Sequence, residues 1–242
     1  MLSKKNRLRV RKIHKLTGLV LGVQLSFWII SGIYFSWIPL NTVRGRDMAN
    51  NKEVPHLQIG KTIPLKEVKD LDKLIIQEVR LVTSPSSQLL YKVKTATEWL
   101  SFDAESGEKL PVLSEAEISE IAKRDYREDA IVKSIQLVKE QAPQEFKGAL
   151  PVYLVEMDDF RGTNLYFDPS SGEILARRNH YWRVFDFLWM LHILDFGGRE
   201  NFNNSLLRAF SLFSILIVAS GYGIYFSLKL KKSTFQTQKE NQ

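Results

Sequence analysis

Few side chains in this sequence could do chemistry. There is no cysteine, so disulfides, thiolate catalysis and cysteine metal sites are excluded. No nucleophile motif, P-loop, dinucleotide-binding glycine pattern or zinc-type histidine spacing occurs. The four histidines lie far apart in the chain, at His14, His56, His180 and His192. The residues alone therefore support neither a soluble-type enzyme active site nor a cofactor.

Several carboxylate side chains lie in a repeated sequence motif. The pattern F-D-x-x-S-G-E-x-L begins at Phe102 and again at Phe167, and each copy follows a tyrosine-containing strand. Asp103, Glu105, Asp168 and Glu173 could form a cation or acid–base site, but a turn is the preferred interpretation.

In that turn, Phe102 and Phe167 each end a strand with the ring in the core. The aspartates Asp103 and Asp168 accept backbone hydrogen bonds at the start of the turn. Gly107 and Gly172 supply the positive φ that other residues resist.

The elements around each copy form a unit of one helix and three antiparallel strands. Helix signals begin at Pro64 and at Ser114, where Ser114 and Glu117 form a capping box and the helix is expected to end near residue 123. The predicted strands cover residues 75–83, 88–95, 98–103, 131–139, 151–158 and 163–168.

Two segments are long and apolar enough to span a membrane. No charged residue occurs from Leu16 to Val43 or from Ala209 to Leu228. A helix of about 20 apolar residues crosses the hydrocarbon layer. The first segment is too long for a signal-peptide core and no cleavage-site pattern follows it, so we interpret it as an uncleaved anchor.

The distribution of charge along the chain predicts its membrane topology. Residues 1–15 carry +7 and residues 229–242 carry +3 of a net +7, which leaves −3 for the rest of the chain. Basic tails beside membrane helices favour the cytoplasmic side. We therefore expect both termini in the cytoplasm and residues 40–204 in the periplasm of an inner-membrane protein. Because the folded part is not basic, no nucleic-acid partner is expected.

Small residues at helical spacing suggest how the two spans meet. Gly18 and Gly22 form one pair, and Ala219 and Gly223 form another. Such pairs allow helices to approach closely in lipid. We weigh packing at these pairs equally against the plain frequency of glycine in membrane helices.

The expected fold class is an α+β membrane protein, with two spans flanking an extracytoplasmic domain. We expect eight parts along the chain: cytoplasmic tail 1–15, span 16–38, linker 39–60, first unit 61–112, second unit 113–179, helix and loop 180–204, span 205–229 and cytoplasmic tail 230–242. The segment from Tyr181 to Phe196 is too short and too charged to span, so we expect a helix lying along the outer membrane surface.

The order of these features resembles the PepSY-associated transmembrane family. The tyrosine strands followed by F-D-x-x-S-G-E-x-L look like PepSY domains, which are small αβββ modules outside the membrane. The stretches from His14 to Gly22 and from Phe187 to Arg199 are similar to the family's first helix and to its Leu-His…Gly word. The resemblance covers nearly the whole chain.

Two main functions follow from the residues and the resemblance, and a third, modulation of a protease, rests only on the association of PepSY modules with proteases. One is a non-enzymatic accessory that binds a membrane or periplasmic partner, or a second copy of itself. The alternative is a haem-b electron-transfer subunit, a component of a ferric-chelate reductase in iron uptake, with His14 and His192 as haem ligands. Larger members of the family have four or more spans, and this chain has two.

The predicted membrane topology limits how the two histidines could bind haem. His14 and His192 are expected at opposite faces of a hydrocarbon layer about 30 Å thick, so they cannot share one haem. A dimer or a partner would have to complete a bis-histidine site. The opposing interpretation places both histidines at the headgroup level as structural residues.

Overall fold

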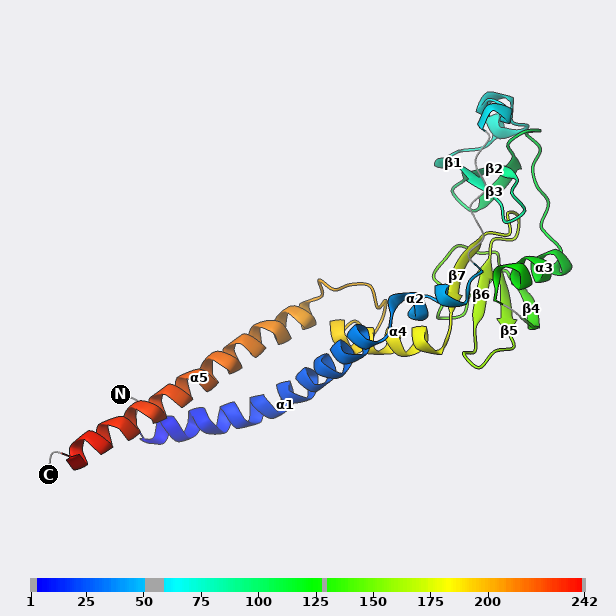
Figure 1. Cartoon of the computed structure of the whole chain (residues 1–242). Helices are drawn as coiled ribbons and strands as arrows, with labels where there is room; N and C mark the ends of the chain where they lie inside the picture. The colour runs from blue at the N-terminus through cyan, green and yellow to red at the C-terminus, as the bar shows by residue number, and fades with distance from the viewer. Residues whose placement is uncertain (1–3, 51–58, 128–129, 241–242) are drawn as a thin grey trace. The chain divides into compact units, whose positions relative to one another are not determined.

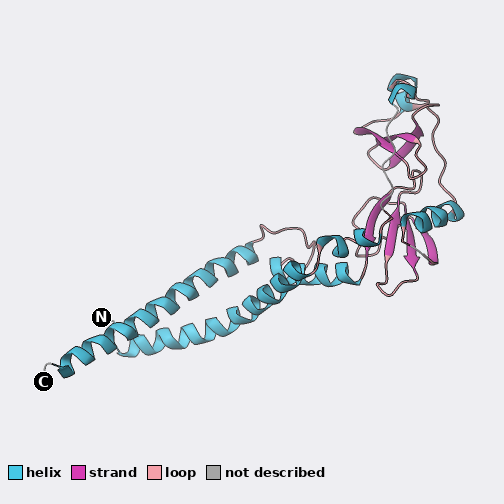
Figure 2. Cartoon of the chain, in the orientation of Figure 1, coloured by secondary structure: helices cyan, strands magenta, loops and turns pink. Residues whose placement is uncertain are grey.

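The structure, a computed structural model, describes residues 4–50, 59–127 and 130–240. It is an α+β chain that divides into two compact units. The helical unit comprises Met1–Trp37 and Val184–Gln242, and the sheet unit comprises Ile38–Arg183. Figures 1 and 2 show the elements of each unit.

Two long helices dominate the helical unit. Helix α1 runs from Lys4 to Trp37 and α5 from Ser205 to Glu240, so each continues the expected span into a basic tail. Within them, Lys12–Trp37 and Ser205–Phe226 are long and apolar enough to cross a membrane. Most of their large apolar side chains are exposed, as in Leu19 and Ile215. Helices that face a hydrocarbon solvent have this character.

The covered side of α1 follows a heptad-like spacing. The less exposed side chains recur every three or four residues, which is the spacing of a helix–helix seam: His14, Thr17, Leu21, Gln24, Trp28, Ser31 and Phe35. Four of these seven are polar. This seam faces α5 near His14 and α4 near Ser31.

The small-residue pairs, for which close packing and plain glycine frequency are weighed equally, have open space around them. A Cβ atom added to Gly18, Gly22 or Gly223 would meet nothing within 4 Å, and Ala219 is exposed. Helices α1 and α5 instead meet where His14 bonds Ser220, beside Gly221. The contact needs a hydrogen-bonding pair, so small size alone did not identify it.

The short helix α4 (His180–Ile193) packs on α1 within the helical unit. Phe185 lies 4.7 Å from Phe35 between ring centroids. Helix α4 ends with its last carbonyls covered by side chains, because Gln24 donates to the carbonyl of Leu191 and Trp28 to that of His192. Asn204 donates to the carbonyl of Ile193. Uncapped carbonyls at a helix end are costly away from water.

The turn after α4 is built around one carboxylate. Asp195 accepts hydrogen bonds from the backbone N–H groups of four residues, Gly197, Gly198, Glu200 and Asn201. Asn204 then caps α5 by accepting from the N–H of Leu207.

The first sheet has the order β1-β2-β3, with strands Glu78–Thr83, Leu89–Lys94 and Trp99–Asp103, all antiparallel. One face buries an apolar core that includes Val93, Leu100 and Phe102.

The helix expected before this sheet is absent, and short 3₁₀ turns replace it at Leu65–Glu67 and Leu71–Lys73, after another at Ile59–Lys61. Leu65, Val68, Leu71 and Leu74 recur every three residues, which suits 3₁₀ turns and not an α-helix. Asp70 breaks the segment with a φ of 60°.

The second sheet has the order β4-β5-β6-β7. Its strands are Val132–Val138, Val152–Met157, Asn164–Phe167 and Ile174–Arg178. Helix α3 (Glu115–Asp125) starts with the Ser114–Glu117 capping box and covers one face of the sheet through Ile118 and Ala122.

Strand β7 was not expected from the sequence. Its two arginines suggest exposure, but Arg177 pairs with Asp125 and Arg178 donates to the carbonyl of Glu145. The short helix α2 (Leu40–Val43) and the 3₁₀ turn Arg46–Met48 precede the sheets along the chain.

Both copies of the repeated motif form the same turn. Asp103 accepts from the N–H groups of Glu105 and Ser106, and Asp168 accepts from those of Ser170 and Ser171. Gly107 and Gly172 have φ values of 71° and 69°. The positive φ disfavours other residues at Gly172, and a Cβ there would lie 2.7 Å from Ile121 Cδ1, so that terminal methyl group would have to shift.

Candidate functional site

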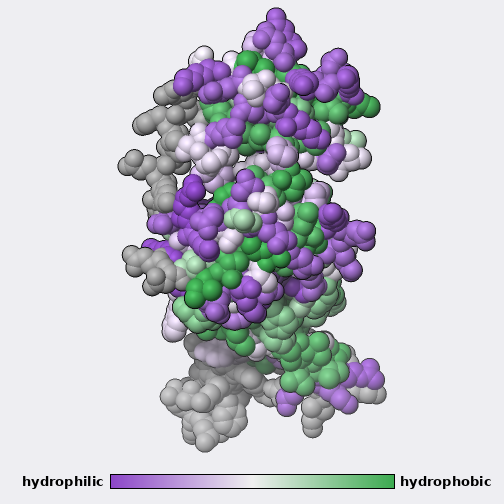
Figure 3. Space-filling view, turned by 90° about the vertical axis from the view of Figure 1, so that its right-hand side faces the viewer, coloured by the Kyte–Doolittle hydropathy of each residue, from purple (hydrophilic) through white to green (hydrophobic). Residues whose placement is uncertain are grey.

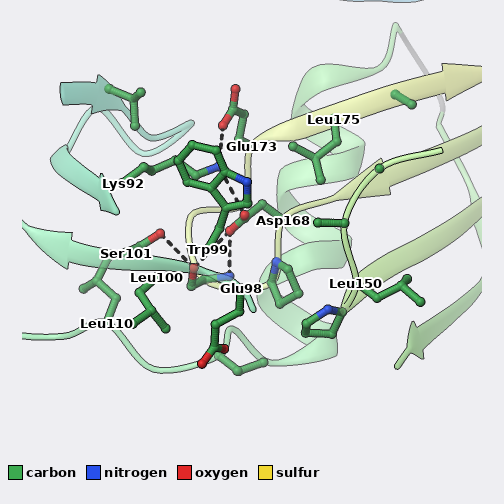
Figure 4. A pocket seen from close by; sticks show the side chains of 18 of the residues that line it. Lys92, Glu98, Trp99, Leu100, Ser101, Leu110, Leu150, Asp168, Glu173 and Leu175 are labelled. Carbon is green, nitrogen blue, oxygen red and sulfur yellow. Dashed lines mark hydrogen bonds and ion pairs between the residues drawn. The ribbon is translucent and has the colours of Figure 1, made fainter. Parts of the chain in front are cut away.

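A cavity of about 480 Å³ lies in the sheet unit, where the polar face of the first sheet meets the β6–β7 turn. Trp99 and Lys92 line it from the first sheet, and Asp168, Glu173 and Leu175 line it from the second (Figure 4). Its volume is in the range of ligand sites, about 300–1,000 Å³. On the outer surface of this unit, hydrophilic side chains surround smaller hydrophobic patches (Figure 3).

Lys92 ties the two sheets together at the cavity wall. Its Nζ lies 3.1 Å from Asp168 Oδ2 and 2.8 Å from Glu173 Oε2. The side chains of Lys92 and Asp168 are only 7% and 8% exposed, whereas Glu173 is 48% exposed. Ser170 Oγ also donates to Ser101 Oγ across the same junction, at 2.8 Å. The aspartate of the second copy therefore joins the sheets in addition to forming its own turn.

The ionisation of Asp168 follows from these contacts. Burial by itself would raise the pKa of Asp168. The nearby Lys92 ammonium and the hydrogen bonds from Ser171 outweigh burial and hold that pKa below its ordinary value. Asp168 is therefore a charged partner of Lys92 at neutral pH.

Cations surround the indole of Trp99. Arg80 Cζ lies 5.2 Å from the ring centroid, Lys92 Nζ lies 5.6 Å from it and Lys94 Nζ 5.9 Å. Distances within about 6 Å allow attraction between a cation and the aromatic face. The arrangement places a flat apolar side chain and positive charge side by side on one wall.

His192 lies in an aromatic setting within the helical unit. Its ring stacks on Trp189 and neighbours Trp28 and Phe35, with centroids 5.7–6.2 Å away. His192 Nδ1 lies 2.7 Å from Ser31 Oγ. Burial lowers the pKa of His192, which favours the neutral imidazole. Since Nδ1 is engaged, Nε2 is the nitrogen left to bind a ligand.

His14, on α1, also contacts a serine through its Nδ1 atom. Its Nδ1 lies 2.8 Å from Ser220 Oγ of α5. Ser31, which holds His192, is 17 residues further along α1, or about 26 Å at 1.5 Å per residue. One chain therefore does not bring His14 and His192 to the same haem.

The remaining candidates are dispersed. His180 is exposed beside Gly162, and His56 lies outside the described residues. Asp103 and Asp168 belong to separate turns, and Asp103 accepts a short hydrogen bond from Gln88. In the part of the chain that the structure describes, no group of three or more His, Cys, Asp or Glu is arranged to hold a metal.

The sequence did not single out Arg80, Lys92, Lys94 and Trp99. The pattern that could have identified them is the alternation of apolar and polar residues along each strand of the first sheet. Apolar residues at every second position face the core. The positions between them, which face the other way, are mostly charged or polar. An uncovered sheet face would have the same pattern, so the sequence could not show that this face meets a second sheet.

Comparison with known proteins provides no relative for this chain. No protein family, no curated protein and no solved structure matches it.

Proposed function

We propose that this protein is anchored in the inner membrane by α1 and α5, with both termini in the cytoplasm and the sheet unit in the periplasm. The two apolar helices and the basic residues beyond their ends support this arrangement. Partly covered polar residues on one side of α1, opposite exposed apolar ones, also suit a helix that faces lipid on one side.

We propose further that the sheet unit corresponds to two tandem PepSY-like units and acts as a non-enzymatic module that binds a partner protein. The observation that carries this proposal is the cavity where the two sheets meet, which combines Trp99 and Leu175 with charged walls. Pockets that mix apolar surface with a few oriented polar groups are typical ligand sites.

Site-specific photo-crosslinking in cells tests this function. A photoreactive amino acid replaces Leu175 at the cavity or, as a control, Ile75, which is 83% exposed and does not line the cavity. We expect a discrete crosslinked product from position 175 and none from position 75. Equal products from both positions, or none from either, would contradict a partner site in the cavity.

A haem-b electron carrier is the second proposal, and one observation favours it. His14 and His192 each engage a serine through Nδ1, which leaves Nε2 toward a ligand, and metal-bound histidines are commonly oriented through their other nitrogen. A single chain does not fit a bis-histidine haem, because His14 and Ser31, the partner of His192, lie 17 residues apart along α1. This function therefore requires a second copy or a partner.

The absorption spectrum of the detergent-purified protein decides the second proposal. Protein from haem-replete cells is measured oxidised and after reduction with dithionite. A Soret band that His192→Ala removes would support haem binding. A flat visible spectrum, in protein purified as a dimer, would exclude haem held between two copies of the chain.

A further inference from the structure

The polar face of the first sheet carries a definite set of charges. Strand pairing places Arg80 opposite Lys92, and Lys94 opposite Trp99. Because side chains alternate across a strand, these four residues lie on the face opposite the apolar core. Lys92 and Trp99 on this face line the cavity. The cavity therefore has one wall made of cations around an indole.

The lining of the whole cavity has more positive than negative charge. Five cationic and three acidic residues line the cavity: Arg80, Lys92, Lys109, Lys147 and Arg178 against Glu98, Asp168 and Glu173. Two of the three acids already pair with Lys92.

Arg80 pairs with Glu78, whereas Lys94 and Lys109 have no ion pair among the described residues. Lys109 therefore brings a positive charge without an ion-pair partner among the described residues to the cavity lining, and Lys94 adds another beside Trp99, outside the lining.

Apolar surface adjoins this charge. Trp99 is half-buried, so part of its indole is accessible, and Leu175 is 41% exposed. Figure 4 shows Trp99 and Leu175 among the labelled side chains of the cavity, with Leu150 nearby. A ligand that suits these walls must carry negative charge next to an apolar group.

We propose that the cavity binds an acidic segment of a partner protein. One carboxylate faces Lys109 in the cavity, and a second faces Lys94, which does not line the cavity but lies 5.9 Å from the ring of Trp99. A neighbouring apolar side chain lies against Trp99 and Leu175. This inference rests on the partner-binding function proposed above and specifies the chemistry of that partner. Charge complementarity is the argument for a peptide of this kind, and the volume admits a few side chains.

Fluorine NMR of the full chain provides a local readout. The protein is labelled with 5-fluorotryptophan and held in detergent, and Trp99→Phe identifies the Trp99 signal among the five. The probe is the blocked peptide acetyl-Glu-Leu-Glu-Leu-amide, with acetyl-Lys-Leu-Lys-Leu-amide as its charge-reversed match. We expect the acidic peptide to shift the Trp99 signal saturably and the basic peptide to leave it unchanged.

Single substitutions measure how much each lysine contributes to binding of the acidic peptide. Lys94→Gln and Lys109→Gln should each weaken binding of the acidic peptide by about three- to tenfold, as the loss of one attractive charge implies. Lys66→Gln, which removes an exposed lysine outside the cavity, should not change it. Urea denaturation reports whether the sheet unit of each variant remains folded, because three of the other four tryptophans lie in the helical unit. A variant that lowers the urea midpoint is replaced by Lys94→Met or Lys109→Met.

Three results would overturn the proposal: no shift at Trp99, equal shifts with both peptides, or the same shift with inorganic phosphate at equal concentration. The last result would indicate a general anion site. If position 175 crosslinks a partner in cells while the acidic peptide does not bind, the partner-binding function survives and the acidic chemistry is wrong. If both experiments fail, the function itself fails.

Discussion

Among single residues, Lys92 has the largest structural consequence. It is a lysine buried between two sheets, and two carboxylates compensate its charge. Removing one partner of a buried ion pair leaves the other charge uncompensated, which is more damaging than replacing both.

We therefore expect Lys92→Met to lower the free energy of unfolding of the sheet unit by about 3 kcal/mol. The double variant Lys92→Met with Asp168→Asn should recover part of this loss. Urea denaturation of the detergent-solubilised protein, monitored by limited proteolysis, measures the free energy of unfolding of the single and the double variant. Lys133→Met is the matched control, since Lys133 pairs with Glu156 at the surface and such pairs contribute about 0–1 kcal/mol. Equal losses at Lys92 and Lys133 would contradict this role.

Asp168 also predicts how stability depends on pH. Its pKa in the folded protein is below the ordinary value of about 3.9, so its stabilising effect is fully present above that value. The effect is lost as pH falls through the lower pKa of the folded state. We expect the urea midpoint of the sheet unit to decrease below about pH 4. The decrease should be shallower in Asp168→Asn, and an unchanged slope in that variant would assign the acid sensitivity to other carboxylates.

Among the elements, the two repeated turns depend on glycine. Gly172 needs positive φ, and a Cβ there would meet Ile121 and Leu113 at 2.7 and 3.2 Å. We expect Gly172→Ala to destabilise the sheet unit by about 2 kcal/mol, mainly through backbone strain at positive φ, with a shift of the Ile121 and Leu113 side chains. Gly60→Ala is the control, because a Cβ there meets nothing within 4 Å. The same denaturation assay compares them, and similar values for the two variants would disprove the steric argument.

Helix α4 depends on side chains of α1 for its C-terminal carbonyls. Replacing Gln24 by Leu removes the donor to the carbonyl of Leu191 without reducing the apolar volume. We expect the last turn of α4 to open more often, with amide hydrogen exchange over Leu188–Ile193 about tenfold faster. Val23→Leu, on the exposed side of α1, should have no effect. Unchanged exchange in Gln24→Leu would show that this contact does not hold the helix end.

For the whole molecule, the lack of cysteine makes the proposed topology directly testable. Ile75→Cys and Ser233→Cys each introduce a single thiol, one in the sheet unit and one in the C-terminal part of α5. In intact cells with a permeable outer membrane, a maleimide that cannot cross the inner membrane should label position 75 alone. Position 233 should react only after lysis. Labelling of both positions in intact cells would place the C-terminus outside.

The sequence was sufficient for features that depend on local pattern. Uncharged runs predicted two helices long enough to span, and the capping box predicted α3. Long-range pairing decided what the sequence missed. Strand β7 ends in two arginines that become acceptable only through Asp125 and the carbonyl of Glu145, and the wall around Trp99 becomes a cavity only when a second sheet faces it.

The two copies of the repeated motif are alike in sequence but are under different structural constraints. Asp103 serves its own turn, whereas Asp168 must also satisfy a lysine in the other sheet. Selection can therefore relax on the first acid while any turn-forming residue remains there. The second acid can drift only together with position 92, so the lineage of this protein should substitute those two sites as a pair.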